Sequence, residues 1–178
     1  MTNPPTVLVV IDAQEGFRNS HTAAVVPSLV AEIRAHAGPI LFTRFVNQTN
    51  SNFERLLGWA AVREGPATQI MVEVAPLTSN KVIFEKSGYS AFSSPAFSDY
   101  CKSLSVQRIK LCGFDTDACV LATALNAFDL GYETIILADA CGSSGGGAMH
   151  AASIEILTPN LGKASIVRGT TNGWTRGL

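Results

Sequence analysis

The sequence lacks a surplus of charge of either sign. Its 178 residues include 13 lysines and arginines against 14 aspartates and glutamates, a formal net charge of −1 at pH 7. Without a basic excess there is no field to attract a polyanion, so nucleic-acid binding is not expected. Charged residues make up only 15% of the chain and hydrophobic residues 47%. That composition excludes a disordered chain or a coiled coil and indicates a folded domain with a large core.

Long hydrophobic runs are also absent. No apolar stretch approaches the roughly 20 residues that a helix needs to cross a bilayer, so no membrane partner is expected. The first residues, Met1–Pro5, contain no basic segment leading into an apolar one. We therefore expect the apolar run that follows to be a first β-strand rather than a secretion signal, and the protein to be cytoplasmic.

Cysteine is scarce. The chain has four cysteines, Cys101, Cys112, Cys119 and Cys141, which are too few for a disulfide framework in a chain of this length. There is no Cys-x-x-Cys pair, and no set of Cys and His residues has the spacing of zinc ligands. We therefore expect four reduced thiols and no structural zinc.

Two patterns alternate along the chain, whose length predicts a single domain over residues 1–178. Short β-branched runs predict strands at Val7–Ile11, Ile40–Phe45, Lys81–Phe84, Arg108–Cys112, Thr134–Ala138 and Ala164–Val167. Stretches with helical spacing lie between them, at Pro27–Ala37, Pro95–Ser103, Ala118–Leu130 and Ala148–Leu157. Strands alternating with helices favour βαβ units. The predicted fold class is α/β, a three-layer Rossmann-like open and mostly parallel sheet with helices on both faces.

One long segment, Val46–Asn80, interrupts the alternation of strands and helices and shows no regular helical or strand periodicity. We expect it to contain a short helix around Phe53–Val62 and a loop near Gly65-Pro66. An excursion of this size at the carboxyl end of a strand is usually a wall of the ligand site in an open α/β sheet.

Chemically active side chains follow three separate strands. Asp12 follows the first strand, Lys86 follows the third, and Cys119 comes shortly after the fourth. Because ligands bind outside the carboxyl ends of parallel strands, we expect an acid, an amine and a thiol to meet at one edge of the sheet. The fifth strand is expected to end in Asp139, where an Asx turn is the ordinary role of such a residue.

The setting of Cys119 predicts a nucleophile. Asp117 or Thr116 is expected to cap the following helix, which places Cys119 in a first turn, where the helix dipole favours a thiolate and free N–H groups can bind an oxyanion. Two simpler interpretations remain open: a small core cysteine, and a structural ion pair between Asp12 and Lys86. The joint placement of all three residues favours catalysis.

Three segments resemble a known family. They are VLVVIDAQEGF (Val7–Phe17), VIFEKSGYSAF (Val82–Phe92) and the long stretch from Leu111 to Cys141 that contains GFDTDACV. In order and separation they are similar to the isochorismatase-like cysteine hydrolases, which include nicotinamidases, N-carbamoylsarcosine amidohydrolase and ureidoacrylate amidohydrolase. The resemblance runs from about Val7 to Leu157, and its third segment is the most specific.

The resemblance implies a catalytic triad of Asp12, Lys86 and Cys119. It also implies a cis peptide bond between Phe114 and Asp115, and an oxyanion hole made by the backbone N–H groups of Asp115 and Cys119. The implied reaction cleaves a C–N bond of a small amide or ureido compound through a Cys119 thioester, with Asp12 as general acid and base and Lys86 as an electrostatic positioner. A homo-oligomer, dimer or tetramer, is implied in the same way.

One departure from the family concerns metal. Nicotinamidases of this family bind a metal through an Asp-x-His and a further His after the second strand, but Thr43–Asn50 contains no histidine. The three histidines, His21, His36 and His150, lie elsewhere in the sequence. We therefore expect no metal and no other cofactor, and nicotinamide becomes a less favoured substrate.

Five further residues are expected to contact the substrate: Gln14, Phe17, Arg44, Asn47 and Tyr89. Further aromatic residues are candidates for the same cavity or for the core: Phe45, Phe53, Trp59 and Phe92.

Three alternatives remain open. The chain could be an isochorismatase-type vinyl-ether hydrolase, a chemistry that can dispense with the cysteine. It could be a non-catalytic redox-sensing α/β module that uses Cys119 as an oxidisable thiol of low pKa. The third alternative is nucleotide binding at the glycine-rich stretch Gly142–Gly147. This stretch lacks the lysine of a P-loop, and its composition favours a flexible loop.

Overall fold

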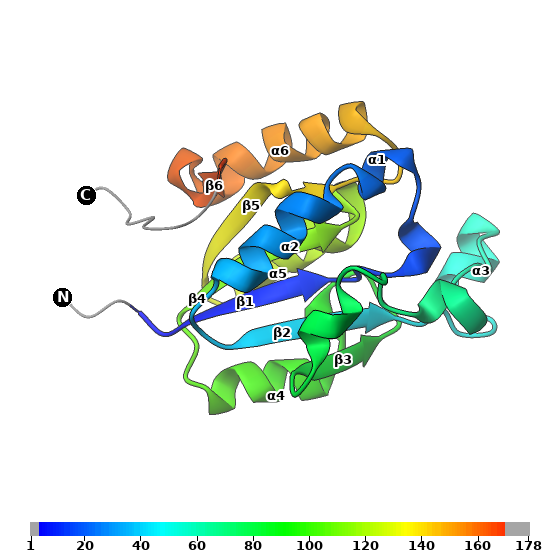
Figure 1. Ribbon diagram of the computed structural model, residues 1–178, viewed down its shortest axis with the longest axis horizontal. Coiled ribbons are helices and arrows are strands. Elements are labelled where there is room, and N and C mark those ends of the chain that lie inside the picture. Colours follow the sequence, from blue (N-terminus) through cyan, green and yellow to red (C-terminus); the bar gives the residue numbers. More distant parts are fainter. Residues whose placement is uncertain (1–3, 170–178) are drawn as a thin grey trace.

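A six-stranded parallel sheet forms the centre of the protein (Figure 1). The computed structural model describes residues 4–169. The strands are β1 (Thr6–Ile11), β2 (Ile40–Phe45), β3 (Val82–Lys86), β4 (Arg108–Phe114), β5 (Glu133–Gly142) and β6 (Ile166–Val167). They lie in the order β3-β2-β1-β4-β5-β6, and every pair is parallel. The order reverses between β1 and β4, which is where an open α/β sheet binds its ligand.

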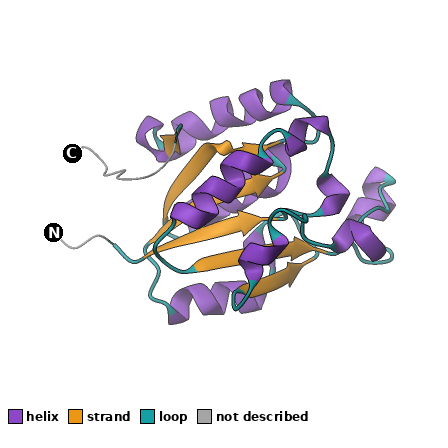
Figure 2. Ribbon diagram, viewed as in Figure 1, coloured by secondary structure: helices purple, strands orange, loops and turns teal. Residues whose placement is uncertain are grey.

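Helices cover both faces of this sheet (Figures 1 and 2). They are α1 (Ser20–Ala23), α2 (Val26–Ala35), α3 (Asn52–Leu57), α4 (Pro95–Ser103), α5 (Leu121–Asp129) and α6 (Gly147–Leu161). Figure 1 shows α2 in front of the sheet and α5 behind it. The predicted three-layer α/β fold is confirmed. Within residues 4–169 no helix combines the length and the apolar character needed to span a membrane.

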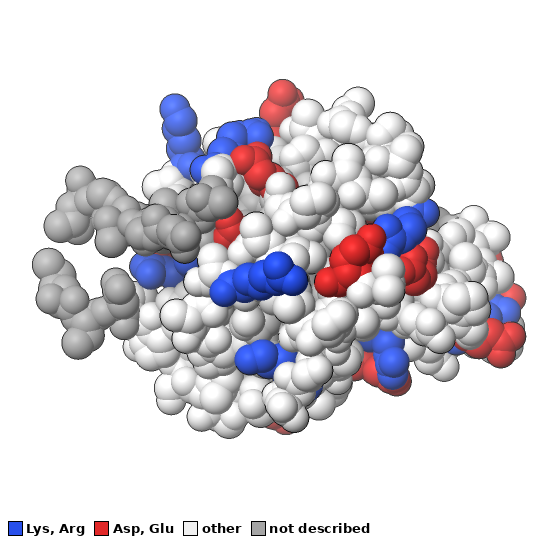
Figure 3. Space-filling model, in the orientation of Figure 1, with Lys and Arg blue, Asp and Glu red and all other residues white. Residues whose placement is uncertain are grey.

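Strand β1 lies at the middle of the core. All five residues of Val7–Ile11 are completely buried, because β2 and β4 flank the strand and helices cover its faces. On the face of the molecule drawn in Figure 3, acidic and basic side chains are scattered singly or in small mixed groups. No large patch of one sign appears on that face, as the near-zero net charge predicts.

Several boundaries differ from the sequence prediction. Strand β5 does not end at Asp139 but continues to Gly142, because the register against β4 shifts between Leu111 and Gly113 and pairing then resumes. The Asp139 side chain lies on the surface, where it accepts a hydrogen bond from the N–H of Gly169 at 2.7 Å. This strand therefore delivers its last residues, Cys141 and Gly142, to the edge where ligands bind.

The segment after β2 contains a shorter helix than the sequence predicts. Helix α3 ends at Leu57, because Gly58 adopts a left-handed conformation with φ of 66° and closes the helix. The predicted helix therefore stops five residues before Val62, and the expected loop at Gly65-Pro66 is a turn of 3-10 helix over Gly65–Thr68. The short helix α1 had no counterpart in the prediction.

Gly113 allows β1 and β4 to approach closely. Its φ is +113°, and a Cβ atom at this position would lie 2.1 Å from the carbonyl oxygen of Ile11. Ile11 and Gly113 are paired in the sheet, and the register shift of β4 begins beside them. Any side chain at residue 113 would push apart the two strands that border the switch point.

We expect Gly113→Ala to lower the free energy of unfolding by more than about 4 kcal/mol or to prevent folding, because strand separation adds to backbone strain. Gly131→Ala is the matched control. Gly131 also has a positive φ, of +87°, but a Cβ there meets nothing within 4 Å. Gly131→Ala should lower the free energy of unfolding by about 1–2 kcal/mol. Urea unfolding of both variants measures the difference, and equal losses would contradict this explanation.

Candidate active site

A buried ion pair joins the ends of β1 and β3. Lys86 Nζ lies 2.7 Å from Asp12 Oδ2, and both side chains are completely buried. The other carboxylate oxygen of Asp12 accepts a hydrogen bond of 2.7 Å from Thr43 Oγ1, on β2. Asp12 and Lys86 are thus held by three neighbouring strands, in the arrangement that the order of the sheet predicts.

The Lys86 ammonium uses all of its donors inside the protein. Besides Asp12, it donates to the carbonyl oxygens of Gly88 at 2.8 Å and Tyr89 at 2.9 Å. Cys119 Sγ lies 3.4 Å from the same nitrogen. Burial alone would lower the pKa of Lys86, but the charge of Asp12 outweighs it, aided by Cys119, and the pKa is raised. Lys86 therefore remains a cation.

Cys119 lies in a turn of π-helix, Thr116–Val120, between β4 and α5. The expected cap by Asp117 or Thr116 is wrong. Asp115 occupies the N-cap position, and its side chain makes no capping bond. Thr116 Oγ1 instead lies 2.9 Å from Nδ1 of His150. The carbonyl oxygen of Asp115 accepts bonds from the N–H groups of residues 118 and 120, on either side of Cys119.

The Cys119 thiol is protonated in the resting protein. Burial raises the pKa of this thiol well above its ordinary value, and the charge of Asp12 acts in the same direction, while Lys86 opposes both. The expectation that the helix start favours a thiolate is therefore wrong for this state, because burial dominates. What the geometry provides is a neutral thiol 3.4 Å from the Lys86 ammonium, which itself lies 2.7 Å from the Asp12 carboxylate.

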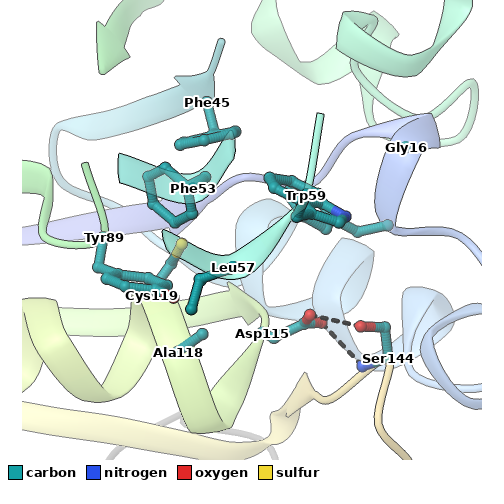
Figure 4. A pocket seen from close by; sticks show the side chains of 11 residues that line it. Gly16, Phe45, Phe53, Leu57, Trp59, Tyr89, Asp115, Ala118, Cys119 and Ser144 are labelled. Carbon is teal, nitrogen blue, oxygen red and sulfur yellow. Dashed lines mark hydrogen bonds between the residues drawn. The ribbon is translucent and has the colours of Figure 1, made fainter. Parts of the chain in front are cut away.

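Asp115 brings a second carboxylate to the site. The Phe114–Asp115 peptide bond is cis, at the position that the family resemblance implies. The Asp115 side chain accepts hydrogen bonds from Ser144 N at 2.8 Å and from Ser144 Oγ at 2.5 Å (Figure 4). Burial raises the pKa of Asp115, and the bonds from Ser144 partly offset that rise.

A cavity of about 310 Å³ opens over Cys119. Its walls are mainly aromatic, formed by Phe17, Phe45, Phe53, Trp59 and Tyr89. These rings pack on one another, with ring centroids 5.1 Å apart for Phe45 and Phe53 and 4.8 Å apart for Phe53 and Tyr89. In Figure 4 the Asp115–Ser144 pair lies at one side of the cavity and Tyr89 at the other.

Of the predicted substrate contacts, Phe17 and Tyr89 line the cavity, whereas Gln14, Arg44 and Asn47 do not. Gln14 is fully buried and clamps the backbone of Phe45, donating to its carbonyl at 2.9 Å and accepting from its N–H at 2.7 Å.

Arg44 and Asn47 have structural partners instead. Arg44 forms a surface ion pair with Glu85 on the neighbouring strand. Asn47 is buried and donates to the carbonyl oxygens of Trp59 and Ala61, both at 3.1 Å. Asn47 therefore stabilises the backbone that frames the cavity, and Arg44 lies on the surface outside it.

Sequence reasoning missed Ser144 and the side chain of Asp115. Ser144 lies in the glycine-rich stretch for which the sequence predicts a flexible loop, and the family resemblance implies a role for the N–H group of Asp115 but none for its side chain. A signal was present, because a buried carboxylate needs donors and serines beside a strand end can supply them.

The stretch after β2 does not fit a metal ion. Residues 43–50 contain no imidazole and no carboxylate, and the Asn47 amide is engaged with backbone carbonyls. Across residues 4–169, no three His, Cys, Asp or Glu side chains are grouped so that they could hold a metal ion.

The isochorismatase domain model matches residues 6–167. Among relatives, the maleamate amidohydrolase of Pseudomonas putida is 26% identical over 151 residues, which cover 76% of this chain and 71% of that protein. The ureidoacrylate amidohydrolase of Acinetobacter baylyi is 25% identical over 203 residues, covering 94% of this chain and 82% of that protein.

Solved structures share the fold. The pyrazinamidase of Pyrococcus horikoshii, solved in complex with zinc, superposes with a TM-score of 0.77 at 24% identity, covering 94% of this chain and 99% of that one. The N-carbamoylsarcosine amidase of Thermoplasma acidophilum gives a TM-score of 0.75 at 17% identity, covering 97% and 99%.

The cavity makes Cys119 the accessible thiol of the native protein. The other three cysteines are at most 2% exposed, and none lines this cavity. We expect iodoacetamide to alkylate Cys119 alone, slowly at neutral pH and faster as pH rises, because its raised pKa limits the thiolate fraction. Peptide mapping measures the site. Cys119→Ala should resist alkylation until denaturant is added, and native labelling of Cys101, Cys112 or Cys141 at a similar rate would contradict the assignment.

Proposed function

The chain belongs to the isochorismatase family, and on that premise we propose that it is a metal-independent cysteine hydrolase that cleaves the C–N bond of a small amide or ureido compound. The observation that carries the proposal is the contact of Lys86 with both Asp12, at 2.7 Å, and Cys119, at 3.4 Å, beneath an aromatic cavity. Maleamate amidohydrolase and ureidoacrylate amidohydrolase, named among the relatives, are consistent with this reaction class.

The first step is attack by the thiol. Asp12 takes the proton of Cys119 as Sγ bonds to the carbonyl carbon of the substrate, and the π electrons of the carbonyl move to its oxygen. The negative charge therefore passes from the carboxylate, through the sulfur, to the substrate. Lys86 remains beside both groups, so its positive charge stabilises the charge as it moves.

The oxyanion that results is placed near the start of the π-helical turn. We assign its two donors to the backbone N–H groups of Asp115 and Cys119. The position of Cys119 in the first turn after β4 supports this assignment. Donors fixed by the backbone need no reorganisation as the charge develops, which is why they accelerate acyl transfer.

Collapse of the intermediate breaks the C–N bond. Asp12, now protonated, gives its proton to the departing nitrogen, which leaves as ammonia or an amine, and a thioester remains on Cys119. Asp12 then removes a proton from water as the water oxygen attacks the thioester, and it returns that proton to Cys119 Sγ as the C–S bond breaks and the acid is released. One carboxylate thus acts twice as a base and twice as an acid, and the cycle ends with Asp12 ionised beside Lys86 and Cys119 as a thiol.

The redox-sensing alternative is disfavoured by the electrostatics of Cys119. An oxidisable sensor thiol needs a low pKa and exposure, whereas burial raises the pKa of Cys119 and the residue is 6% exposed. The nucleotide alternative is weakened too. Gly142 belongs to β5 and Gly147 to α6, and the loop between them carries no lysine to meet a phosphate.

The decisive experiment is ammonia release from a panel of small amides and ureido compounds. Cys119→Ala should lower kcat/KM by at least about a thousandfold, because no other nucleophile replaces the thiol. Cys101→Ala is the matched control, because this buried cysteine on α4 is outside the cavity and its variant should retain activity. An alanine variant at residue 119 that keeps more than about a hundredth of the wild-type rate would rule out the thioester.

Chelation tests the proposed independence from metal. Activity should be unchanged after dialysis against EDTA, because residues 43–50 offer neither imidazole nor carboxylate ligands. The measurement is the rate on the best substrate of the panel, before and after treatment and again after added zinc. A loss with EDTA that zinc reverses would refute this part of the proposal.

A further inference from the structure

We propose that the cavity selects its substrate by charge: it accepts an uncharged amide with an apolar body and rejects amides that carry a carboxylate, and the Asp115 side chain is the residue that determines this preference. The inference rests on the proposed function, because it concerns the substrate of the same site. It makes Asp115 a specificity-determining residue in addition to its backbone role.

Among residues 4–169, no basic side chain lines the cavity to meet a substrate carboxylate. None of the residues that line the cavity is lysine, arginine or histidine. The nearest cation, Lys86, has its three ammonium donors committed to Asp12 and to two backbone carbonyls at 2.7–2.9 Å. A carboxylate entering this space would lose its hydration and find no ionic partner, which is costly in a mainly apolar cavity.

The arginines of the neighbouring strand and loop are engaged elsewhere. Arg44 pairs with Glu85 on the surface, and Arg63 lies 2.6 Å from Glu54. Neither contributes to the lining.

The one carboxylate in the lining is that of Asp115. Its two hydrogen bonds from Ser144, at 2.8 and 2.5 Å, hold it at the side of the cavity, so it cannot easily turn away from an approaching anion (Figure 4). In the proposed mechanism the N–H of the same residue binds the reacting oxygen. A carboxylate on a small substrate would therefore share the same mainly apolar cavity with the Asp115 carboxylate, and like charges repel in such a space.

The rest of the lining suits an apolar body. Five aromatic rings form the walls, and their edge-to-face packing leaves flat, apolar surfaces toward the cavity. The volume of about 310 Å³ limits the substrate to a small molecule. Aromatic walls and a single negative charge together favour an uncharged, flat or apolar carboxamide that can donate a hydrogen bond.

The test compares two substrates that differ in charge but hardly in shape. Terephthalamide and terephthalamate share a benzene ring and one reactive amide, and the second group is an uncharged amide in one and a carboxylate in the other. Initial rates are measured at about pH 8, where carboxyl groups are ionised. After division by two for its two amides, terephthalamide should have a kcat/KM at least about a hundredfold higher. Succinamide and succinamate repeat the comparison without the ring.

Three variants assign the preference to Asp115. Asp115→Asn keeps the size of the side chain and removes its charge, and should narrow the ratio to less than about tenfold. Asp115→Glu keeps the charge and should preserve the ratio. Asp117→Asn removes the same charge two residues away, outside the lining, and should leave the ratio unchanged. Each ratio compares kcat/KM for two substrates of the same variant, so a loss of activity that affects both substrates equally does not change the ratio.

The outcomes separate this inference from the proposed function. Equal rates on both substrates, or a preference for the anion, would overturn charge selection while the hydrolase proposal stands. An unchanged ratio in Asp115→Asn would overturn the role of Asp115. If neither amide is hydrolysed, the proposed activity has failed, and the affinities of the two compounds for Cys119→Ala are measured by calorimetry. Tighter binding of the diamide supports charge selection. Equal affinities, or no binding of either compound, overturn charge selection.

Discussion

The buried ion pair between Lys86 and Asp12 is the constraint on which the rest of the site depends. Removing two charges from water is costly, and the cost is offset only when geometry is good and the remaining polar atoms are satisfied. Here Thr43 bonds the second oxygen of Asp12, and two backbone carbonyls bond the ammonium. These partners come from β2 and from the turn after β3. The carboxyl ends of β1, β2 and β3 must therefore meet in one arrangement, which holds the Asp12 carboxylate and the Lys86 ammonium side by side.

Burial explains why Cys119, the proposed nucleophile, rests as a thiol. Burial raises the pKa of Cys119, and the charge of Asp12 adds to this effect, whereas Lys86 opposes it. Transfer of the thiol proton to Asp12 would leave the total charge of the three side chains unchanged. In the proposed mechanism, proton transfer coupled to attack is consequently easier than ionisation of the thiol in advance.

The order of the strands along the sequence predicts which residues meet at one edge of the sheet. It does not predict on which face of the sheet each side chain lies. Parallel strands end at one edge, so the meeting of Asp12, Lys86 and Cys119 follows from the order of the elements. Arg44 also lies at the end of a strand, but successive side chains of a strand point to opposite faces. Phe45 lines the cavity while Arg44 lies outside it, beside Glu85. The end of β5 was missed because a register shift leaves no clear pattern in a single sequence.

Chemistry and substrate choice come from different parts of the chain. The reacting groups are fixed by strands, whereas Phe53, Leu57 and Trp59 come from the excursion after β2. Gln14 and Asn47 secure that excursion through backbone bonds to Phe45 and Trp59, which accounts for their burial without any contact with the cavity. These bonds do not involve the Lys86–Asp12 pair. Substitutions among the residues of the cavity wall therefore need not move the side chains of that pair. Substrate range is therefore expected to vary within such a fold more readily than reaction type.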